Sequence, residues 1–260
     1  MKLLTDVLRA LPEFQKLLAA IDGGGCPAAF SGLSPVLRAY VAAGIRREAR
    51  QSVVLVCADE SDAERLARDL RSLTEEEVLL IAPREFTFHH AAVVSRQYEH
   101  RRLAAFRALS QDRAGLAVVT VEALLQRTLP PELLSAACRT LRAGGSCDLA
   151  ELTEALTAAG YARCQQVEGV GQFALRGGIL DVFSPAREKP VRVEFFGDEI
   201  DSMGEFDVNT QRRTANLDEV ELLPAAEVLP HLAPGGLSGL TDRLRQLLEQ
   251  VRRRKGEQAG

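Results

Sequence analysis

Short apolar runs alternate with amphipathic helical segments up to about residue 130, and this alternation constrains the fold more than any other feature. Val53–Cys57 is a continuous apolar run, which is typical of a strand covered on both faces of a sheet. Residues 78–82 and 116–119 predict two further buried strands. A helical apolar stripe separates the first two runs and consists of Ala63, Leu66, Ala67, Leu70 and Leu73. Strands that alternate with helices in this way predict an α/β fold built on a parallel sheet.

The pattern changes near residue 139. One helix is predicted for residues 148–159, with Asp148 as its N-cap and Gly160 at its end. Short strand-like segments separated by turn residues then extend to residue 223. This second pattern predicts an α+β region with an antiparallel sheet.

The C-terminal part of the sequence predicts a hinge followed by a helix. Pro224–Gly236 is rich in proline and glycine, which favours the hinge. An apolar stripe at helical spacing follows and consists of Leu237, Leu240, Leu244, Leu247, Leu248 and Val251. The run Arg252–Lys255 is typical of a solvated helix end, where cations interact favourably with the helix dipole. A chain that stops soon after one amphipathic helix is expected to be part of a longer protein.

The composition is that of an ordinary globular protein, with 46% hydrophobic and 26% charged residues. No stretch approaches the roughly 18 consecutive apolar residues of a transmembrane helix, so no membrane span is predicted. Asp6 and Arg9 interrupt the N-terminal segment, which therefore does not resemble a signal peptide. The formal net charge of −4 disfavours a protein whose main task is to bind phosphates.

The cysteines and histidines predict no metal site. The five cysteines are widely spaced and form no CxxC pair, which disfavours both zinc and a disulfide framework and predicts a cytoplasmic location. His89 and His90 have no carboxylate or cysteine at ligand spacing. His100 is expected on a solvated helix face beside Arg101 and Arg102. No arrangement of these residues predicts a catalytic site.

A parallel α/β sheet often carries a phosphate-binding loop between a strand and the helix that follows it. Such a loop needs a GxxxxGK[ST] pattern, because backbone amides hold the phosphates while the lysine reaches the terminal ones. The candidate strand-to-helix turn at residues 28–35 has one glycine and no lysine, and Pro35 follows Ser34 as in an ordinary capped helix start. We therefore expect no nucleotide cofactor and no ATP hydrolysis by this chain.

Gly169–Ala174 matches a GxGxxA pattern, and Glu194 follows about 20 residues later, as in a dinucleotide-binding fingerprint. That fingerprint requires a helix directly after the loop. Gly177 and Gly178 would break such a helix within one turn. The segment is therefore interpreted as a hairpin turn that leads into a strand.

Val191–Phe196 is the segment most informative about function. Strand alternation places three of its side chains in the core: Val191, Val193 and Phe195. The same alternation places Arg192, Glu194 and Phe196 on the opposite, hydrated face. Arginine beside an exposed aromatic residue is typical of a binding hot spot.

Arg176, in the preceding strand-like segment, could join the same face, although Gly177 and Gly178 obscure its phase. The alternative is purely structural. Phe196 would then pack under a loop, and the arginines would pair with Asp198 or Glu199. The residues alone leave both interpretations open.

A family resemblance is carried by RGGILDVFSPAREKPVRVEFFGDEIDSMGEFDVNTQR, residues 176–212. This stretch resembles the second domain of bacterial UvrB, and it is more similar still to the UvrB-homology module at the N-terminus of the transcription-repair coupling factor family. A weaker resemblance extends over residues 28–230. UvrB has a working phosphate loop and a tyrosine-rich hairpin that clamps DNA. Here the loop lacks its lysine and residues 83–100 offer only Phe86, Phe88 and Tyr98, which favours the coupling-factor family.

The resemblance implies a specific architecture: a degenerate helicase-like parallel-sheet domain with an inserted α+β domain like UvrB domain 2. Residues 1–138 would form domain 1a, which has lost its nucleotide site. Residues 139–224 would form domain 2, and residues 225–260 would begin domain 1b with the hinge and the amphipathic helix.

The resemblance also implies a non-catalytic module that recruits the damage-recognition ATPase UvrA to stalled RNA polymerase during nucleotide excision repair. Family contact positions correspond to Arg176, Arg192 and Phe196, with Glu194 ranked below them. In the full-length family protein, an ATP-dependent DNA translocase, this surface is masked by a C-terminal domain, and the contacts with RNA polymerase and DNA lie in other domains. The alternatives are a residual ATP-dependent, UvrB-like helicase domain and DNA binding through the basic run or the Arg101–Arg102 helix.

Overall fold

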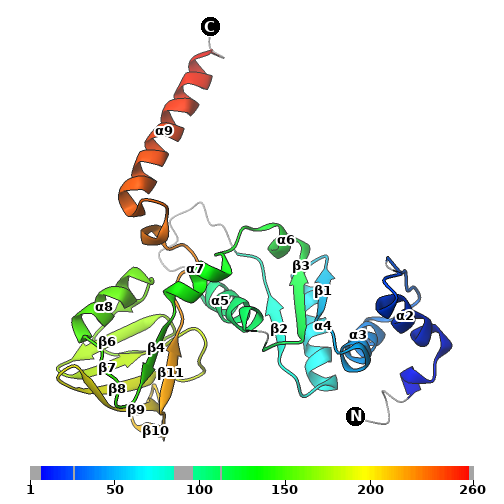
Figure 1. Ribbon diagram of the computed structural model, residues 1–260, viewed down its shortest axis with the longest axis horizontal. Helices are drawn as coiled ribbons and strands as arrows, with labels where there is room; N and C mark the ends of the chain where they lie inside the picture. The colour runs from blue at the N-terminus through cyan, green and yellow to red at the C-terminus, as the bar shows by residue number, and fades with distance from the viewer. Residues whose placement is uncertain (1–6, 26, 85–95, 112, 258–260) are drawn as a thin grey trace. The chain divides into compact units, whose positions relative to one another are not determined.

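The computed structural model describes residues 7–25, 27–84, 96–111 and 113–257, and for residues 254–257 it describes the backbone alone. The chain divides into two compact units, Met1–Thr128 and Leu129–Gly260. Figure 1 shows the helices and strands of both units. The predicted boundaries at residues 139 and 225 remain predictions.

The first unit contains a three-stranded parallel sheet in the order β1-β3-β2. Its strands are β1 (Val53–Cys57), β2 (Val78–Ile81) and β3 (Leu116–Thr120). Its helices are α2 (Pro12–Asp22), α3 (Pro35–Ala49), α4 (Glu60–Leu73), α5 (Gln97–Ser110) and α6 (Val121–Leu125). The alternation of strands and helices thus produces the predicted parallel α/β arrangement.

Helices cover the two faces of this sheet unequally. Side chains of α3 and α4 pack with all three strands on one face, whereas α5 packs with β2 and β3 on the other. Every residue of β3 is buried, but Val54 and Val56 of the edge strand β1 are 56% and 52% exposed. The prediction that Val53–Cys57 is covered on both faces is therefore wrong, because nothing in the α5 cluster comes from β1.

The second unit is built on a six-stranded sheet in the order β10-β9-β8-β7-β6-β5. Its strands are β5 (Ala162–Arg163), β6 (Gln172–Arg176), β7 (Ile179–Val182), β8 (Val191–Phe196), β9 (Glu199–Phe206) and β10 (Arg213–Asn216). A two-stranded antiparallel sheet pairs β4 (Arg139–Arg142) with β11 (Glu219–Leu222). The helical elements of this unit are α7 (Pro131–Ala137), α8 (Leu149–Ala158), the short 3-10 helix η1 (Pro230–Leu232) and α9 (Gly236–Glu257).

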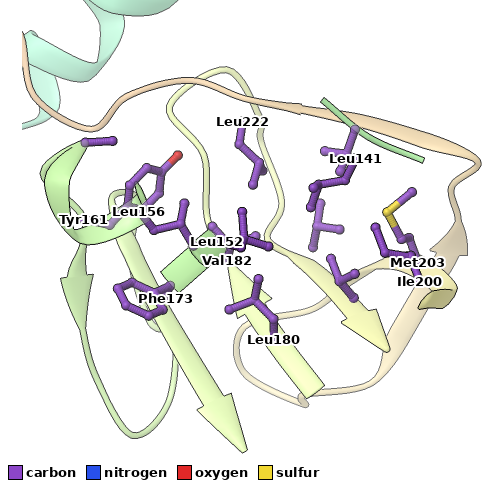
Figure 2. Close-up of a cluster of buried hydrophobic side chains, with 14 of the residues drawn as sticks. Leu141, Leu152, Leu156, Tyr161, Phe173, Leu180, Val182, Ile200, Met203 and Leu222 are labelled. Carbon is purple, nitrogen blue, oxygen red and sulfur yellow. The ribbon is translucent and has the colours of Figure 1, made fainter. Parts of the chain in front are cut away.

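One face of the six-stranded sheet forms the main core with α8 and the β4–β11 pair. Figure 2 shows the side chains that converge there, among them Leu141, Leu152, Leu156, Phe173, Leu180, Ile200, Met203 and Leu222. Tyr161 lies in this core, and its hydroxyl donates to the carbonyl oxygen of Leu223. Val191 and Val193 are fully buried on the same face, as strand alternation predicts.

Local signals in the second unit are largely confirmed. The Asp148 side chain accepts a hydrogen bond from the Glu151 backbone N–H (2.9 Å), and α8 begins at the next residue. The turn at Gly169–Gly171 leads into β6 and not into a helix. It is not a hairpin, however, because β5 and β6 pair in parallel while the other neighbours in the sheet are antiparallel.

The predicted hinge is partly packed. Ala225 is fully buried in the main core, and its backbone N–H donates to the Ala159 carbonyl (2.9 Å). The apolar stripe of α9 is exposed at Leu237, Leu244, Leu247, Leu248 and Val251. Over the described ranges, no helix combines the length and apolarity that a membrane crossing requires.

Candidate protein-binding site

The predicted residues come together on the face of the six-stranded sheet opposite the main core, which we call the outer face. Arg192 of β8 lies directly opposite Asp181 of β7, and both stand between core-facing neighbours on their strands. Arg176 pairs with Ile179, which in turn pairs with Glu194. The phase of Arg176 is thereby fixed: it shares the outer face with Arg192 and Glu194.

Asp181 organises the two arginines. Its side chain is 1% exposed, and each of its oxygens accepts a hydrogen bond from Arg192, with Oδ1 to Nε at 2.7 Å and Oδ2 to Nη2 at 2.9 Å. Oδ2 also accepts from Arg176 Nη2 at 2.6 Å. A buried carboxylate requires such compensation, because an unpaired charge in the interior is strongly unfavourable.

Arg192 is mostly enclosed. Its guanidinium lies 4.8 Å from the centre of the buried Phe206 ring, and Nη1 donates to the Gln211 carbonyl at 3.3 Å. Only 18% of the side chain is exposed. The hydrogen bonds with Asp181 raise the pKa of Arg192 above its ordinary value, because they favour the charged form of the guanidinium.

Arg176 is more accessible, with 49% of its side chain exposed. It ends β6 directly before the two-residue turn of Gly177 and Gly178, where Gly177 has φ +61°. A side chain at that position would be strained, which explains the glycine. The turn therefore places Arg176 at the end of the outer face, close to solvent.

Phe196 is 83% exposed at the end of β8. Its neighbour Phe195 packs against the main core, so the alternation continues through the two aromatic residues. The following turn begins at Gly197, which has φ +63°. The alternative in which Phe196 packs under a loop is wrong.

Glu194 is already paired. Its Oε2 accepts from Ser202 Oγ at 2.7 Å and lies 3.9 Å from Arg213 Nη1. Arg213 reaches this position across Gly204, where an added Cβ would overlap the arginine. The carboxylate is 40% exposed and belongs to the rim of the candidate site.

The alternative pairing of the arginines with Asp198 or Glu199 is also wrong, since both arginines pair with Asp181. Sequence reasoning missed Asp181, although a signal was present. Leu180 and Val182 face the core, so alternation places the carboxylate between them on the outer face. The contribution of Gln211 could not be found in this way, because it comes from a loop carbonyl.

Comparisons with known proteins identify this region. Residues 140–228 match the UvrB interaction domain. Along 208 residues the chain is 37% identical to the transcription-repair-coupling factor of Myxococcus xanthus, an alignment that covers 76% of this chain and 17% of the relative. It is 30% identical over 253 residues to that of Staphylococcus aureus strain MRSA252, which covers 97% of this chain and 21% of the relative.

The predicted family resemblance is confirmed. The chain spans about a fifth of the length of the curated transcription-repair-coupling factors that it matches. The four predicted site residues, Arg176, Arg192, Glu194 and Phe196, all lie within the UvrB interaction domain. So does Asp181, whereas α9 lies outside the matched residues.

Outside the UvrB interaction domain, the start of α3 differs from the expected turn. Residues 27–33 form no strand before it, although α3 does begin at Pro35 with Ser34 as its N-cap. The Ser34 side chain makes no capping hydrogen bond. No lysine is present at this helix start to reach a phosphate.

The expected solvated face of α5 is wrong for two of its residues. His100 is 8% exposed and Arg102 is fully buried. Arg102 lies on the side of α5 that packs with the sheet. Arg102 Nη1 donates to the Ala82 carbonyl at 2.6 Å, and the guanidinium lies 5.0 Å from the Phe106 ring centre. Arg101 remains exposed, so the DNA-binding alternative keeps one of its two helix arginines.

Several of the candidate metal ligands and aromatic residues belong to the segment 85–95. His89, His90, Phe86 and Phe88 lie outside the described residues, as does Cys26. Within the described ranges, no group of three or more histidine, cysteine and acidic side chains is placed to hold a metal ion.

Proposed function

We propose that this chain is a non-catalytic recruitment module that binds UvrA in transcription-coupled nucleotide excision repair. The observation that carries the proposal is the exposed Phe196 ring on the same sheet face as Arg176. Support comes from the UvrB interaction domain and from the relatives named transcription-repair-coupling factor.

The exposed groups have the chemistry of a protein-binding hot spot. Phe196 offers a large apolar surface at little entropic cost on binding, because few of its torsions have to be fixed. Arg176 presents a cation that attracts an acidic partner surface and orients it. Ile179, which is 37% exposed, adds apolar area beside them. We therefore assign UvrA binding to Arg176, Phe196 and the supporting Arg192, with Glu194 at the rim.

The first unit is proposed to be a helicase-like domain that has lost its nucleotide site. Its parallel sheet supports this, together with a helix start that lacks the phosphate-binding lysine. Residues 1–138, 139–224 and 225–260 then correspond to domains 1a, 2 and the start of 1b. In a longer protein, a C-terminal domain would mask the outer face, and other domains would contact RNA polymerase and DNA.

The test is calorimetric titration of purified UvrA with the wild-type chain and with Phe196→Ala. We expect Phe196→Ala to weaken binding by about 2 kcal/mol without unfolding the protein, because truncating a hot-spot aromatic removes desolvated contact area. Leu125→Ala is the matched control, since Leu125 is 81% exposed but lies on α6 in the other unit.

Arg176→Ala is the better partner for a double variant than Arg192→Ala, because Arg192 also compensates the buried Asp181. Wild-type affinity in the Phe196→Ala/Arg176→Ala protein would contradict the proposal. The control Leu125→Ala protein should bind UvrA as tightly as the wild type.

A further inference from the structure

We infer that Asp181 is a positioning residue of the UvrA-binding surface: its buried carboxylate fixes the orientation in which Arg176 and Arg192 are presented. The inference rests on the proposed function and deepens it. Asp181 would not touch the partner, since its side chain is 1% exposed. It would act through the two arginines.

The geometry supports a different task for each arginine. Arg192 uses Nε and Nη2 on the carboxylate and Nη1 on the Gln211 carbonyl, so its guanidinium is held at three nitrogens. Arg176 uses Nη2 alone on Asp181, and half of its side chain is exposed. A guanidinium has five N–H donors, so Arg176 keeps donors that can be directed to a partner.

Anchoring one nitrogen restricts the rotamers of a long side chain before binding. An unanchored arginine would have to lose that freedom when the complex forms, which reduces affinity. The bond from Arg176 Nη2 to Asp181 Oδ2 therefore prepares the exposed donors of Arg176 for binding.

Because of the charge balance, the direction of the change in affinity tests the inference. Asp181 neutralises one of the two arginine charges, and Glu194 is paired with Arg213. Replacing Asp181 by a neutral residue would therefore add one net positive charge to the surface. By charge alone, an acidic partner would then bind more tightly. If Asp181 positions the arginines, the partner binds less tightly.

The principal experiment is titration of purified UvrA with the Asp181→Asn chain at low and at physiological salt. Asparagine keeps the shape of the side chain and one acceptor oxygen but removes the charge. We expect affinity to fall about 10-fold, whereas equal or tighter binding would overturn the inference. Circular dichroism at the titration temperature confirms that the variant is folded, since a loss of stability alone would not change the affinity of the folded protein.

A double-mutant cycle distinguishes positioning from a general structural effect. We expect Asp181→Asn to cost less affinity once Arg176 is replaced by alanine, because only Arg192 then remains to be oriented. The same change should retain its full effect in the Phe196→Ala background. A loss that persists undiminished in Arg176→Ala would show that Asp181 does not act through Arg176.

Arg176→Lys keeps the inference testable if Asp181→Asn does not fold. Lysine retains the charge on this half-exposed position but not the planar fork that can hold Asp181 and the partner together. We expect an affinity loss close to that of Arg176→Ala, and wild-type affinity would overturn the inference. Absence of UvrA binding by the wild-type chain would contradict the proposed function itself, which is a distinguishable result.

Discussion

The two faces of the six-stranded sheet are stabilised by different means. The inner face packs apolar side chains such as Val193 and Phe173 against α8 and the β4–β11 pair. The outer face has a smaller apolar cluster, which includes Phe206, and in addition places Asp181 between two arginines, one of which stacks on the Phe206 ring. Apolar neighbours are largely interchangeable if their volume is conserved, whereas a buried carboxylate requires particular donors. Substitutions on the outer face therefore act on specific pairs.

The outer face also changes in character along its length. Side-chain exposure rises from 18% at Arg192 to 49% at Arg176, and Phe196 is 83% exposed as a residue. We therefore expect stability effects to dominate at Arg192 and binding effects to dominate at Phe196. The inner face should show stability effects throughout.

The largest effect is expected on the inner face. Phe173 is fully buried in the main core, so Phe173→Ala should lower the free energy of unfolding by about 3–5 kcal/mol, through lost burial and the cavity left behind. Chemical denaturation followed by circular dichroism measures this. A loss below about 1 kcal/mol would mean that the core relaxes to fill the space, and the contrast between the two faces would be weaker than described.

Arg192→Ala should cost about 3 kcal/mol of stability, because it leaves the buried Asp181 with only its single bond from Arg176. Arg142→Ala is the matched control. It removes the ion pair between Arg142 Nε and Glu219 Oε2, which are 2.6 Å apart. Because these side chains are 69% and 54% exposed, the loss of stability should be within about 1 kcal/mol. Equal losses in the two variants, measured by urea denaturation, would show that burial of Asp181 adds nothing.

Alternation and local capping were sufficient to predict much of this arrangement. The assignment of Val191 and Val193 to the core follows from a period of two, and the start of α8 follows from the capping side chain of Asp148. Both signals are local. The edge position of β1 has no local signal, because strand order is a property of the whole sheet. The apolar run therefore predicted burial at Val54, which is exposed.

The sequence predicted which sheet face carries the candidate site, but not which carboxylate pairs with its arginines. A period of two places Arg192 and Glu194 on the outer face, yet it does not specify which carboxylate lies opposite on the neighbouring strand. Proximity in sequence therefore favours the acids Asp198 and Glu199 as partners, whereas the strand register places Asp181 opposite Arg192. The burial of Arg102 was not predictable for a similar reason. An arginine on a helix is expected to be solvated, and its acceptor, the Ala82 carbonyl, is known only from the structure.

A smaller effect is expected from close packing on the outer face. Gly204 lies directly opposite Arg192, and an added Cβ there would overlap the Arg213 side chain and the Ala215 carbonyl oxygen. Gly204→Ala should therefore cost about 2 kcal/mol, because the backbone oxygen cannot move as freely as an arginine. Thermal unfolding measures it. An unchanged midpoint would show that β10 shifts at no cost.

The smallest effect is expected at the rim. Glu194 already accepts from Ser202 and lies near Arg213, so it contributes little direct affinity. Glu194→Gln should change stability by less than about 0.5 kcal/mol, since the pair with Arg213 is long and partly exposed.

Glu194→Gln also removes one negative charge beside Arg192, so association with an acidic surface of UvrA should become modestly faster at low salt, with little change in dissociation. Stopped-flow association at two salt concentrations measures this. A large rise in the dissociation rate would instead place Glu194 among the direct contacts and extend the binding surface toward β10.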